Sequence, residues 1–256
     1  MLRNITAAIA VGLLVASTGI ASADEWGSIK GKFVVTGKVP EPAAVVCNKD
    51  PATCCKEKLV DESLVVSKEG GLANVFVYAR SKVAKIHPDY DKAAASPVVL
   101  DNKACVFHPH AVAVWTKQKL SLKNSDDVGH NTNYGSPTAN NFNVLIAPGQ
   151  AVEKSLTAAE NLPQNISCNI HPWMQAKLLV RDNPYFAVSA ADGTFGIKNI
   201  PSTEEVEFVV WHEKVGYLKT LKFSGGETDA KGRFKMKVGD AKDFGDIKID
   251  AATLSK

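Results

Sequence analysis

Short apolar and β-branched runs, separated by turn residues, recur along most of this 256-residue chain. Turn signals stand at Gly70-Gly71, Pro148-Gly149, Asp192-Gly193 and Gly225-Gly226. Runs of this length and spacing predict an all-β fold built from sandwiches rather than alternating α/β units. The expected strands cover residues 29–35, 72–78, 98–100, 106–115, 120–123, 143–146, 151–156, 176–180, 195–198 and 206–212. Two short helices are expected within residues 81–95 and 157–161.

The composition is that of an ordinary globular protein, with 45% hydrophobic and 22% charged residues. The length suits one large domain or two small ones. The net charge is only +3 and no block of basic residues stands out. We therefore expect neither nucleic acid nor an anionic surface as a partner.

The first 23 residues have the features of a secretory signal peptide. Arg3 supplies a positive charge, residues 5–14 form a short apolar run, and Ala21-Ser22-Ala23 is a small-residue cleavage motif. An uncleaved membrane anchor is the alternative, but the run is short for spanning a bilayer. No later stretch is apolar enough to cross a membrane, so we expect a periplasmic or secreted protein in a compartment that permits disulfides.

One short stretch carries the chemistry of the chain. Residues 168–174 read Cys-Asn-Ile-His-Pro-Trp-Met, which spaces Cys168, His171 and Met174 as C-x2-H-x2-M. A further histidine, His130, follows an Asp/Asn-rich segment upstream. One thiolate, two imidazoles and a weak thioether form a ligand set suited to copper. Pro172 stiffens the loop, because its φ is fixed and it offers no amide donor.

A plainer interpretation of the same residues remains open. Cys168 could form a disulfide, His171 could lie on the surface, and Met174 could pack in the core.

Several motifs around this loop resemble those of one known family. Residues 107–114 resemble an F-x-P-x-x-V-x-V strand, residues 124–131 resemble the strand end that presents a first histidine, and Pro148-Gly149 matches a turn. Together with the loop at 168–174, they resemble a cupredoxin of the plastocyanin and amicyanin type over residues 98–181. The resemblance implies one type 1 copper ion, with Cys168, His130 and His171 as equatorial ligands and Met174 as the axial ligand. It also implies outer-sphere electron transfer through an exposed edge of His171.

The two flanks are similar to a different module. Residues 27–33, and the segment 191–201 with its D-G-x-F-x-I-x-N-I-P pattern, are similar to carboxypeptidase-regulatory-like, or transthyretin-like, β-sandwiches. We therefore expect a signal peptide at 1–23, a cupredoxin Greek-key sandwich at 93–181, and a second small sandwich made from 24–92 and 182–256. The alternative is a single cupredoxin with extra strands.

Four cysteines remain if Cys168 binds metal: Cys47, Cys54, Cys55 and Cys105. A bond between the neighbours Cys54 and Cys55 is sterically poor, so we expect Cys105 to pair with one of the other three, with room for a second bridge. Binding of a soft metal by the 47–55 cluster is the alternative.

Other residues near the motif allow two interpretations each. His108 and His110 alternate on an expected strand and so share a face. They are interpreted as two solvent-facing histidines, with a second metal site as the alternative. Trp173 fits a core position or an apolar docking patch equally well.

These features favour an electron carrier over the other functions considered. Copper storage or delivery, a copper enzyme and a cell-envelope binding module are the alternatives. A complete set of four ligands argues against an enzyme, because catalytic metals keep a vacant or water-filled position. We expect a protein redox partner, such as a c-type cytochrome or an oxidoreductase.

Overall fold

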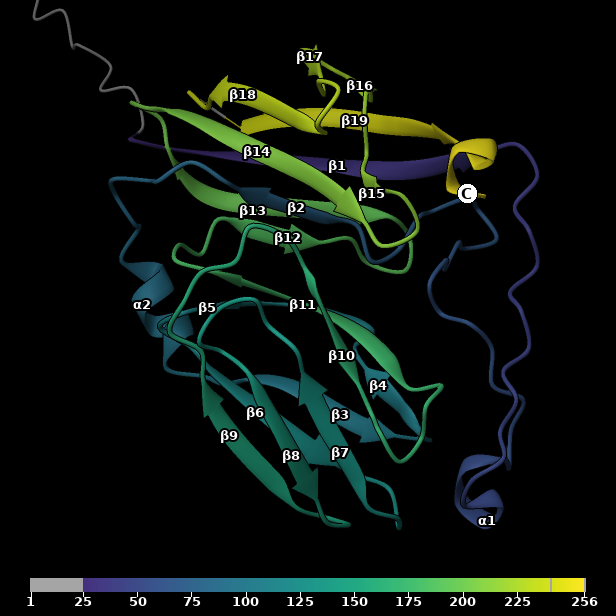
Figure 1. Cartoon of the computed structure of the whole chain (residues 1–256). Coiled ribbons are helices and arrows are strands. Elements are labelled where there is room, and N and C mark those ends of the chain that lie inside the picture. Colours follow the sequence, from purple (N-terminus) through teal and green to yellow (C-terminus); the bar gives the residue numbers. More distant parts are fainter. Residues whose placement is uncertain (1–24, 240, 256) are drawn as a thin grey trace, which may run out of the picture.

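The computed structural model describes residues 25–239 and 241–255, so the predicted signal peptide at 1–23 lies outside the described residues. Strands dominate the described chain, which confirms the predicted all-β class (Figure 1). The strands are β1 Trp26–Thr36, β2 Phe76–Ala79, β3 Val98–Lys103, β4 Val106–His108, β5 Ala111–Trp115, β6 Lys119–Asn124, β7 His130–Tyr134, β8 Phe142–Ile146, β9 Ala151–Ser155, β10 Gln164–Ser167, β11 Gln175–Arg181, β12 Phe186–Val188, β13 Thr194–Pro201, β14 Glu205–His212, β15 Gly216–Tyr217, β16 Lys222–Phe223, β17 Gly226–Glu227, β18 Arg233–Lys237 and β19 Ala241–Asp250. The helices are α1 Pro51–Cys54, α2 Asp89–Ala94 and the 3-10 turn η1 Ala251–Leu254.

Strands β3 to β11 form a sandwich that we call the central sandwich. One sheet has the order β5-β11-β10-β7-β8 and the other β4-β3-β6-β9. Their facing sides bury one apolar core. In β11 the alternation of a strand is visible, because Leu178 and Val180 enter this core while Leu179 points to the opposite side.

The chain ends supply a second sandwich, which we call the terminal sandwich. Its sheets are β13-β1-β19 and β12-β2-β14-β15, with β18 paired to β14. Gly71 and Gly193 belong to two turns that lie close to each other and to β1. A Cβ on Gly193 would lie 2.3 Å from the carbonyl oxygen of Phe33 in β1. The Asp192-Gly193 turn therefore requires glycine for close approach as well as for its φ of +86°. The likeness of this sandwich to a known module, and the predicted domain boundaries, stay proposals.

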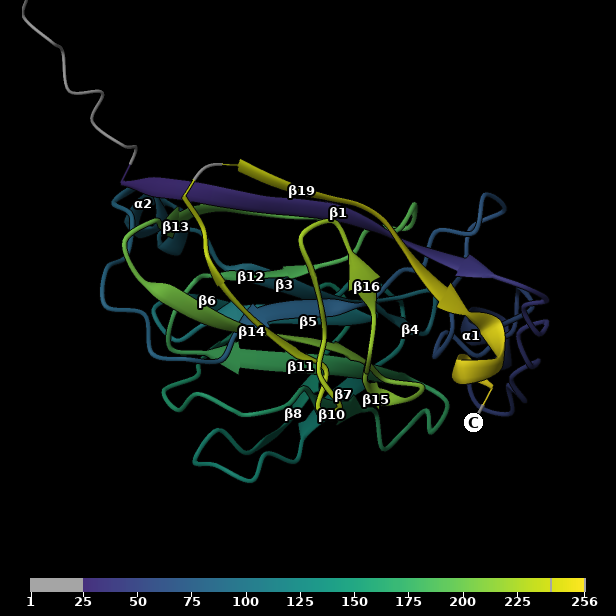
Figure 2. The same cartoon turned by 90° about the horizontal axis from the view of Figure 1, so that it is seen from above.

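The two sandwiches are stacked, which gives four layers of sheet (Figure 1). Seen from above, strands of the terminal sandwich overlie those of the central sandwich (Figure 2). A third apolar cluster lies between the inner sheets and contains Phe76, Tyr78, Leu179, Val209 and Trp211. Where β11 and β14 are buried on both faces, their sequences are short continuous apolar runs, residues 178–180 and 208–211.

Several expected elements differ from those of the structure. The expected strand at 72–78 begins only at Phe76. The expected strand at 106–115 is two strands, β4 and β5, with a break at Pro109, which has no N–H for a ladder. The predicted helix at 157–161 is wrong, because the Asn140 side chain accepts the backbone N–H groups of Thr157 and Ala158 and holds them in a loop. Within 81–95 the helix covers only α2.

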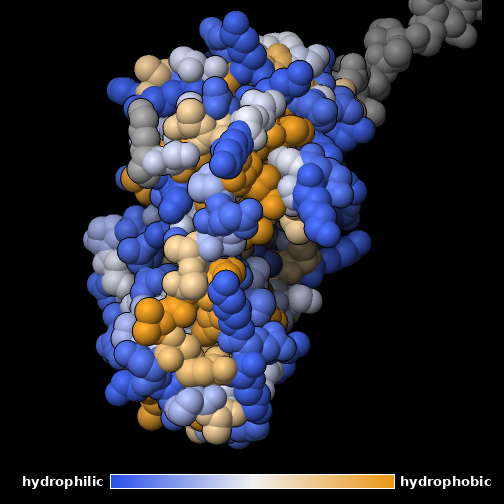
Figure 3. Space-filling view, turned by 90° about the vertical axis from the view of Figure 1, so that its right-hand side faces the viewer, coloured by the Kyte–Doolittle hydropathy of each residue, from blue (hydrophilic) through white to orange (hydrophobic). Residues whose placement is uncertain are grey.

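After β1 the chain leaves the terminal sandwich and runs down to α1, which lies beside the central sandwich (right side of Figure 1). The side of the molecule that faces the viewer in Figure 3 shows apolar patches among hydrophilic residues. Val46, just before α1, is 80% exposed. Among the described residues, every helix is too short and polar to traverse a lipid bilayer.

Candidate metal centre

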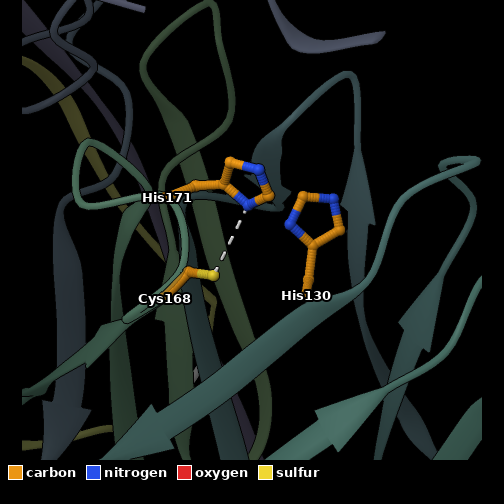
Figure 4. A group of neighbouring side chains, drawn as sticks. All are labelled: His130, Cys168 and His171. Carbon is orange, nitrogen blue, oxygen red and sulfur yellow. Dashed lines mark hydrogen bonds between the residues drawn. The ribbon is translucent and has the colours of Figure 1, made fainter. Parts of the chain in front are cut away.

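The structure brings three of the four predicted ligands into one buried group. His130 is the first residue of β7, Cys168 directly follows β10, and His171 lies on the loop from β10 to β11. Strands β7 and β10 are antiparallel neighbours, so these positions meet at one end of the sheet. The ligand atoms of the three side chains all lie within 4.8 Å of one another. Figure 4 shows the two rings and the thiol pointing toward a common space.

The ring nitrogens that face this space are the Nδ1 atoms. Nδ1 of His171 lies 3.8 Å from Sγ of Cys168 (dashed line in Figure 4). Nδ1 of His130 is buried and has no hydrogen-bond partner among the described residues. Buried polar atoms without a partner are costly, so an inward-facing nitrogen beside a thiol fits a metal ligand.

Met174 ends the segment 168–174, which carries three of the predicted ligands and which we call the ligand loop. Its side chain is buried in the same apolar cluster as Cys168. The loop is closed by backbone hydrogen bonds, because Met174 N–H donates to the His171 carbonyl at 2.9 Å and Cys168 N–H donates to the Met174 carbonyl at 3.2 Å. This turn keeps the methionine next to the cysteine, and its role as axial ligand remains a proposal.

Each imidazole has a carboxylate on its outer nitrogen, Nε2. Asp126 Oδ2 lies 2.9 Å from Nε2 of His130, and Asp50 Oδ2 lies 2.8 Å from Nε2 of His171. Burial and the nearby His171 lower the pKa of His130, although Asp126 opposes the shift. A neutral imidazole with its outer nitrogen protonated presents a lone pair at Nδ1, which is the form that binds a metal.

The Asn131 side chain holds the start of the ligand loop. Its Oδ1 accepts the backbone N–H groups of Asn169 at 2.8 Å and Ile170 at 3.3 Å, and it lies 3.4 Å from Sγ of Cys168. Its Nδ2 donates to Asn143 Oδ1 on β8. Asn131 is therefore a site residue whose role was missed, although its pairing with His130 in sequence belonged to the noted motif.

One expectation about the site is wrong. The side chain of His171 has no exposed edge, because its exposed fraction is 0%. Asp50 and the segment that carries it cover the ring, so both histidines are enclosed. Asp50 is 121 residues from His171 along the chain, and nothing in the sequence marked it.

The disulfides explain how that segment is held. Cys105 is bonded to Cys54, which confirms the prediction that it pairs with one of three cysteines, and a second bond joins Cys47 to Cys55. The alternative of a soft metal at these cysteines is thereby wrong. Cys168 is the free cysteine of the described residues and is buried.

The neighbouring histidines differ from their favoured interpretation. His108 is exposed on β4, whereas His110 lies after the break at Pro109 and is buried. Nε2 of His110 is 3.2 Å from Glu213 Oε2, and its Nδ1 is 3.9 Å from Glu62 Oε2. The two histidines therefore do not share one solvent-facing surface. His110 links the two sandwiches through Glu213, which directly follows β14.

Trp173 occupies a half-buried position beside the ligand loop. Its indole N–H donates to the Cys105 carbonyl at 3.0 Å, and its ring centroid is 5.3 Å from that of His171. The side chain packs against the central core, which favours the structural role over the docking role.

Comparisons with known proteins find similarity only among solved structures; no protein-family model and no curated protein matches the chain. An oxidised mutant of amicyanin is 17% identical with a TM-score of 0.31, over 41% of this chain and 98% of that one. A purple cupredoxin from Nitrosopumilus maritimus is 18% identical with a TM-score of 0.29, over 33% and 99%. A Cu-containing nitrite reductase from Thermus scotoductus SA-01 is 16% identical with a TM-score of 0.31, over 34% of this chain.

The chain spans only 22% of the length of that nitrite reductase. Because all these TM-scores are low, the function proposed below rests on the side chains of this protein.

Proposed function

We propose that His130, Cys168, His171 and Met174 bind one copper ion and that the protein carries single electrons between redox partners. The observation that supports this most is the buried group of one sulfur and two nitrogen atoms, all within 4.8 Å of one another. Thiolate and imidazole together suit copper in both of its common oxidation states. A bound copper ion would supply a one-electron couple between Cu(II) and Cu(I) in a type 1 site.

The protein itself keeps the proposed ligands fixed in place and shielded from solvent. His130, Cys168 and His171 are each at most 1% exposed. Asn131 and the backbone bonds of the loop hold two of the ligands, and β7 holds the third. Ligands that keep their places during a change of charge keep the reorganisation small, which favours electron transfer over binding alone.

Storage or delivery of copper and catalysis are less well supported. Delivery requires ligands that a recipient can reach, and these ligands are buried. Catalysis requires an open coordination position, and the proposed set of four ligands leaves none. The electron carrier is therefore the function that the geometry supports best.

We further propose that the protein works outside the cytoplasm with a protein partner, such as a c-type cytochrome or an oxidoreductase. Two disulfides in one small region are typical of an oxidising compartment. The predicted signal peptide agrees with a periplasmic or secreted location.

The test is copper loading of the mature protein, followed by metal analysis and an optical spectrum. We expect one copper per chain and an intense colour from charge transfer between the Cys168 thiolate and Cu(II). Cys168→Ser should abolish the colour, while His108→Ala, which removes an exposed histidine outside the group, should leave it unchanged. A colourless copper-loaded wild type, or a Cys168→Ser variant with the wild-type spectrum, would contradict the proposal.

A further inference from the structure

The carboxylate of Asp50 contacts the proposed metal centre from a distant part of the chain. Its Oδ2 lies 2.8 Å from Nε2 of His171, whose side chain is fully buried, while the side chain of Asp50 is 44% exposed. Within the described residues, Asp50 makes no side-chain capping hydrogen bond to α1, the helix that it precedes. Its carboxylate is thus directed at the histidine rather than used to begin the helix.

Residues 47–55, which we call the cap, hold Asp50 in this position. The Cys47–Cys55 bond closes the cap on itself, and the Cys54–Cys105 bond ties it to the central sandwich. The backbone carbonyl of Asp50 accepts the N–H group of Cys54 at 2.8 Å. Its φ of +47° is left-handed, a conformation that Asp and Asn adopt more readily than other residues with side chains.

The second histidine shows the same arrangement with a different anchor. Asp126 Oδ2 lies 2.9 Å from Nε2 of His130 and also accepts the backbone N–H of Cys105 at 2.8 Å. A carboxylate on the outer nitrogen of a metal-binding imidazole fixes its tautomer and its ring orientation. Asp126 is buried and belongs to the central sandwich, whereas Asp50 belongs to the cap, which holds it beside His171.

Cys105 joins these contacts into one network. Its N–H donates to Asp126, its carbonyl accepts the indole N–H of Trp173 on the ligand loop, and its sulfur is bonded to Cys54 of the cap. The disulfide therefore sets the position of Asp50 relative to the groups behind the other histidine and beside the ligand loop.

We infer that Asp50 is a positioning residue of the metal centre, acting through Nε2 of His171. It holds His171 in the tautomer that leaves Nδ1 free for the metal and keeps the ring turned toward Cys168. Its negative charge also stabilises the more highly charged state of a metal bound there, Cu(II) over Cu(I). The inference rests on the proposed copper site.

The variants Asp50→Asn and Asp50→Ala distinguish the effect of the Asp50 charge from that of its hydrogen bond to His171. Asn keeps an acceptor oxygen and tolerates the left-handed backbone, so Asp50→Asn should stay folded, bind copper and keep its colour. The loss of charge should shift the Cu(II)/Cu(I) equilibrium toward Cu(I) by about tenfold, which is about 59 mV for one electron. Asp50→Ala should release copper to a chelator about 10- to 100-fold faster, as expected for loss of an outer partner of a ligand.

A readout on the metal-free protein tests positioning directly. The ¹⁵N shifts of the His171 ring should report one tautomer, protonated at Nε2, in the wild type and in Asp50→Asn. Asp50→Ala should show a mixture of tautomers. Glu57→Gln, which removes an exposed carboxylate just after the cap, is the matched control and should leave tautomer, potential and release rate unchanged.

The outcomes distinguish the inference from the proposed function. A wild type that binds no copper refutes the proposed function, and the inference falls with it. A wild type that binds copper, with Asp50→Asn and Asp50→Ala indistinguishable from Glu57→Gln in potential, release rate and tautomer, overturns the inference alone. If Asp50→Ala does not fold, the potential of Asp50→Asn decides, because a merely structural role for the cap leaves the potential unchanged.

Discussion

The carboxamide oxygen of Asn131 accepts the backbone N–H of Asn169 at 2.8 Å, and this bond ties β7 to the residue that follows the proposed ligand Cys168. Asn131→Ala removes an acceptor shared by two backbone N–H groups, so we expect a loss of about 1–3 kcal/mol in the free energy of unfolding. The copper-loaded variant should also show a shifted charge-transfer band, since Cys168 moves with the loop. Urea unfolding and the optical spectrum measure the two effects.

The control is Asn133→Ala on the same strand. Its side chain makes a single, longer contact of 3.4 Å to Asn169 Oδ1 at the exposed edge. We expect a change within about 0.5 kcal/mol, as for most surface substitutions. Equal losses in the two variants would show that Asn131 does not hold the loop.

Met174 should tune the metal rather than retain it. The axial thioether bond in such sites is long and weak, so Met174→Leu should still bind copper and should have a higher reduction potential. The swap keeps the volume of a fully buried side chain, so the free energy of unfolding should fall by less than about 1.5 kcal/mol. Voltammetry and metal analysis check this, and complete loss of copper would argue against an axial role.

The two disulfides should differ in their contributions to stability. Cys54–Cys105 spans 51 residues and Cys47–Cys55 spans 8. In the chain-entropy model the longer loop contributes about 4 kcal/mol and the shorter one roughly 2–3 kcal/mol. Thermal unfolding of Cys54→Ser/Cys105→Ser and of Cys47→Ser/Cys55→Ser compares them. Thiol counting on the metal-free protein should find one free cysteine, Cys168, and five free thiols would contradict both bonds.

The proximity of the proposed ligands in the loop was predictable because these residues are close in sequence. Cys168, His171 and Met174 lie within seven consecutive residues, and one loop between two strands places them together. Asp50 was not predictable, since only the cap and its disulfides bring it to His171. The contact depends on long-range connectivity that no local pattern reports.

The strands next to the site were missed for a related reason. β7 reads His-Asn-Thr-Asn-Tyr and β10 reads Gln-Asn-Ile-Ser, and neither shows an apolar alternation. Most polar side chains of β7 are buried, and Asn131 is satisfied there because it bonds to the Asn143 side chain and to loop backbone. Apolar strands such as β11 and β14 were found because burial alone explains their sequences.

Burial of His212 predicts a pH-dependent stability. His212, at the end of β14, is fully buried, and desolvation lowers its pKa to about 4. His212 therefore binds a proton below about pH 6.5 in the unfolded chain, but only below about pH 4 in the folded chain. The free energy of unfolding should fall by about 3 kcal/mol as the pH drops through this window. Below about pH 4, His212 should add no further change with pH.

Urea unfolding of wild type and His212→Gln at pH 7 and pH 4.5 measures this difference. The variant should lose less stability than the wild type between the two pH values. Glu213 also has a lowered pKa, but its effect belongs to lower pH, where carboxylates become protonated. Identical losses in both proteins would exclude His212 as the group responsible.

A redox partner should dock on the exposed apolar side of the ligand loop. Ile170 lies between two proposed ligands and is 36% exposed, and Leu145 on β8, opposite Asn131 in the ladder, is 67% exposed. The cap covers His171, and the indole N–H of Trp173 donates to the Cys105 carbonyl, so Ile170 offers the apolar approach to the site. Small redox interfaces are weak and need little area.

We therefore expect Ile170→Glu to slow electron exchange with a small c-type cytochrome about tenfold while leaving the optical spectrum intact. The spectrum should survive because the loop is held through the backbone N–H of Ile170, which the substitution keeps. Val99→Glu is the matched control, since Val99 is 45% exposed on β3, away from the ligand loop. Stopped-flow rates decide between them. A partner that reacts equally fast with both variants and the wild type must dock elsewhere, and the cap would then be the next surface to test.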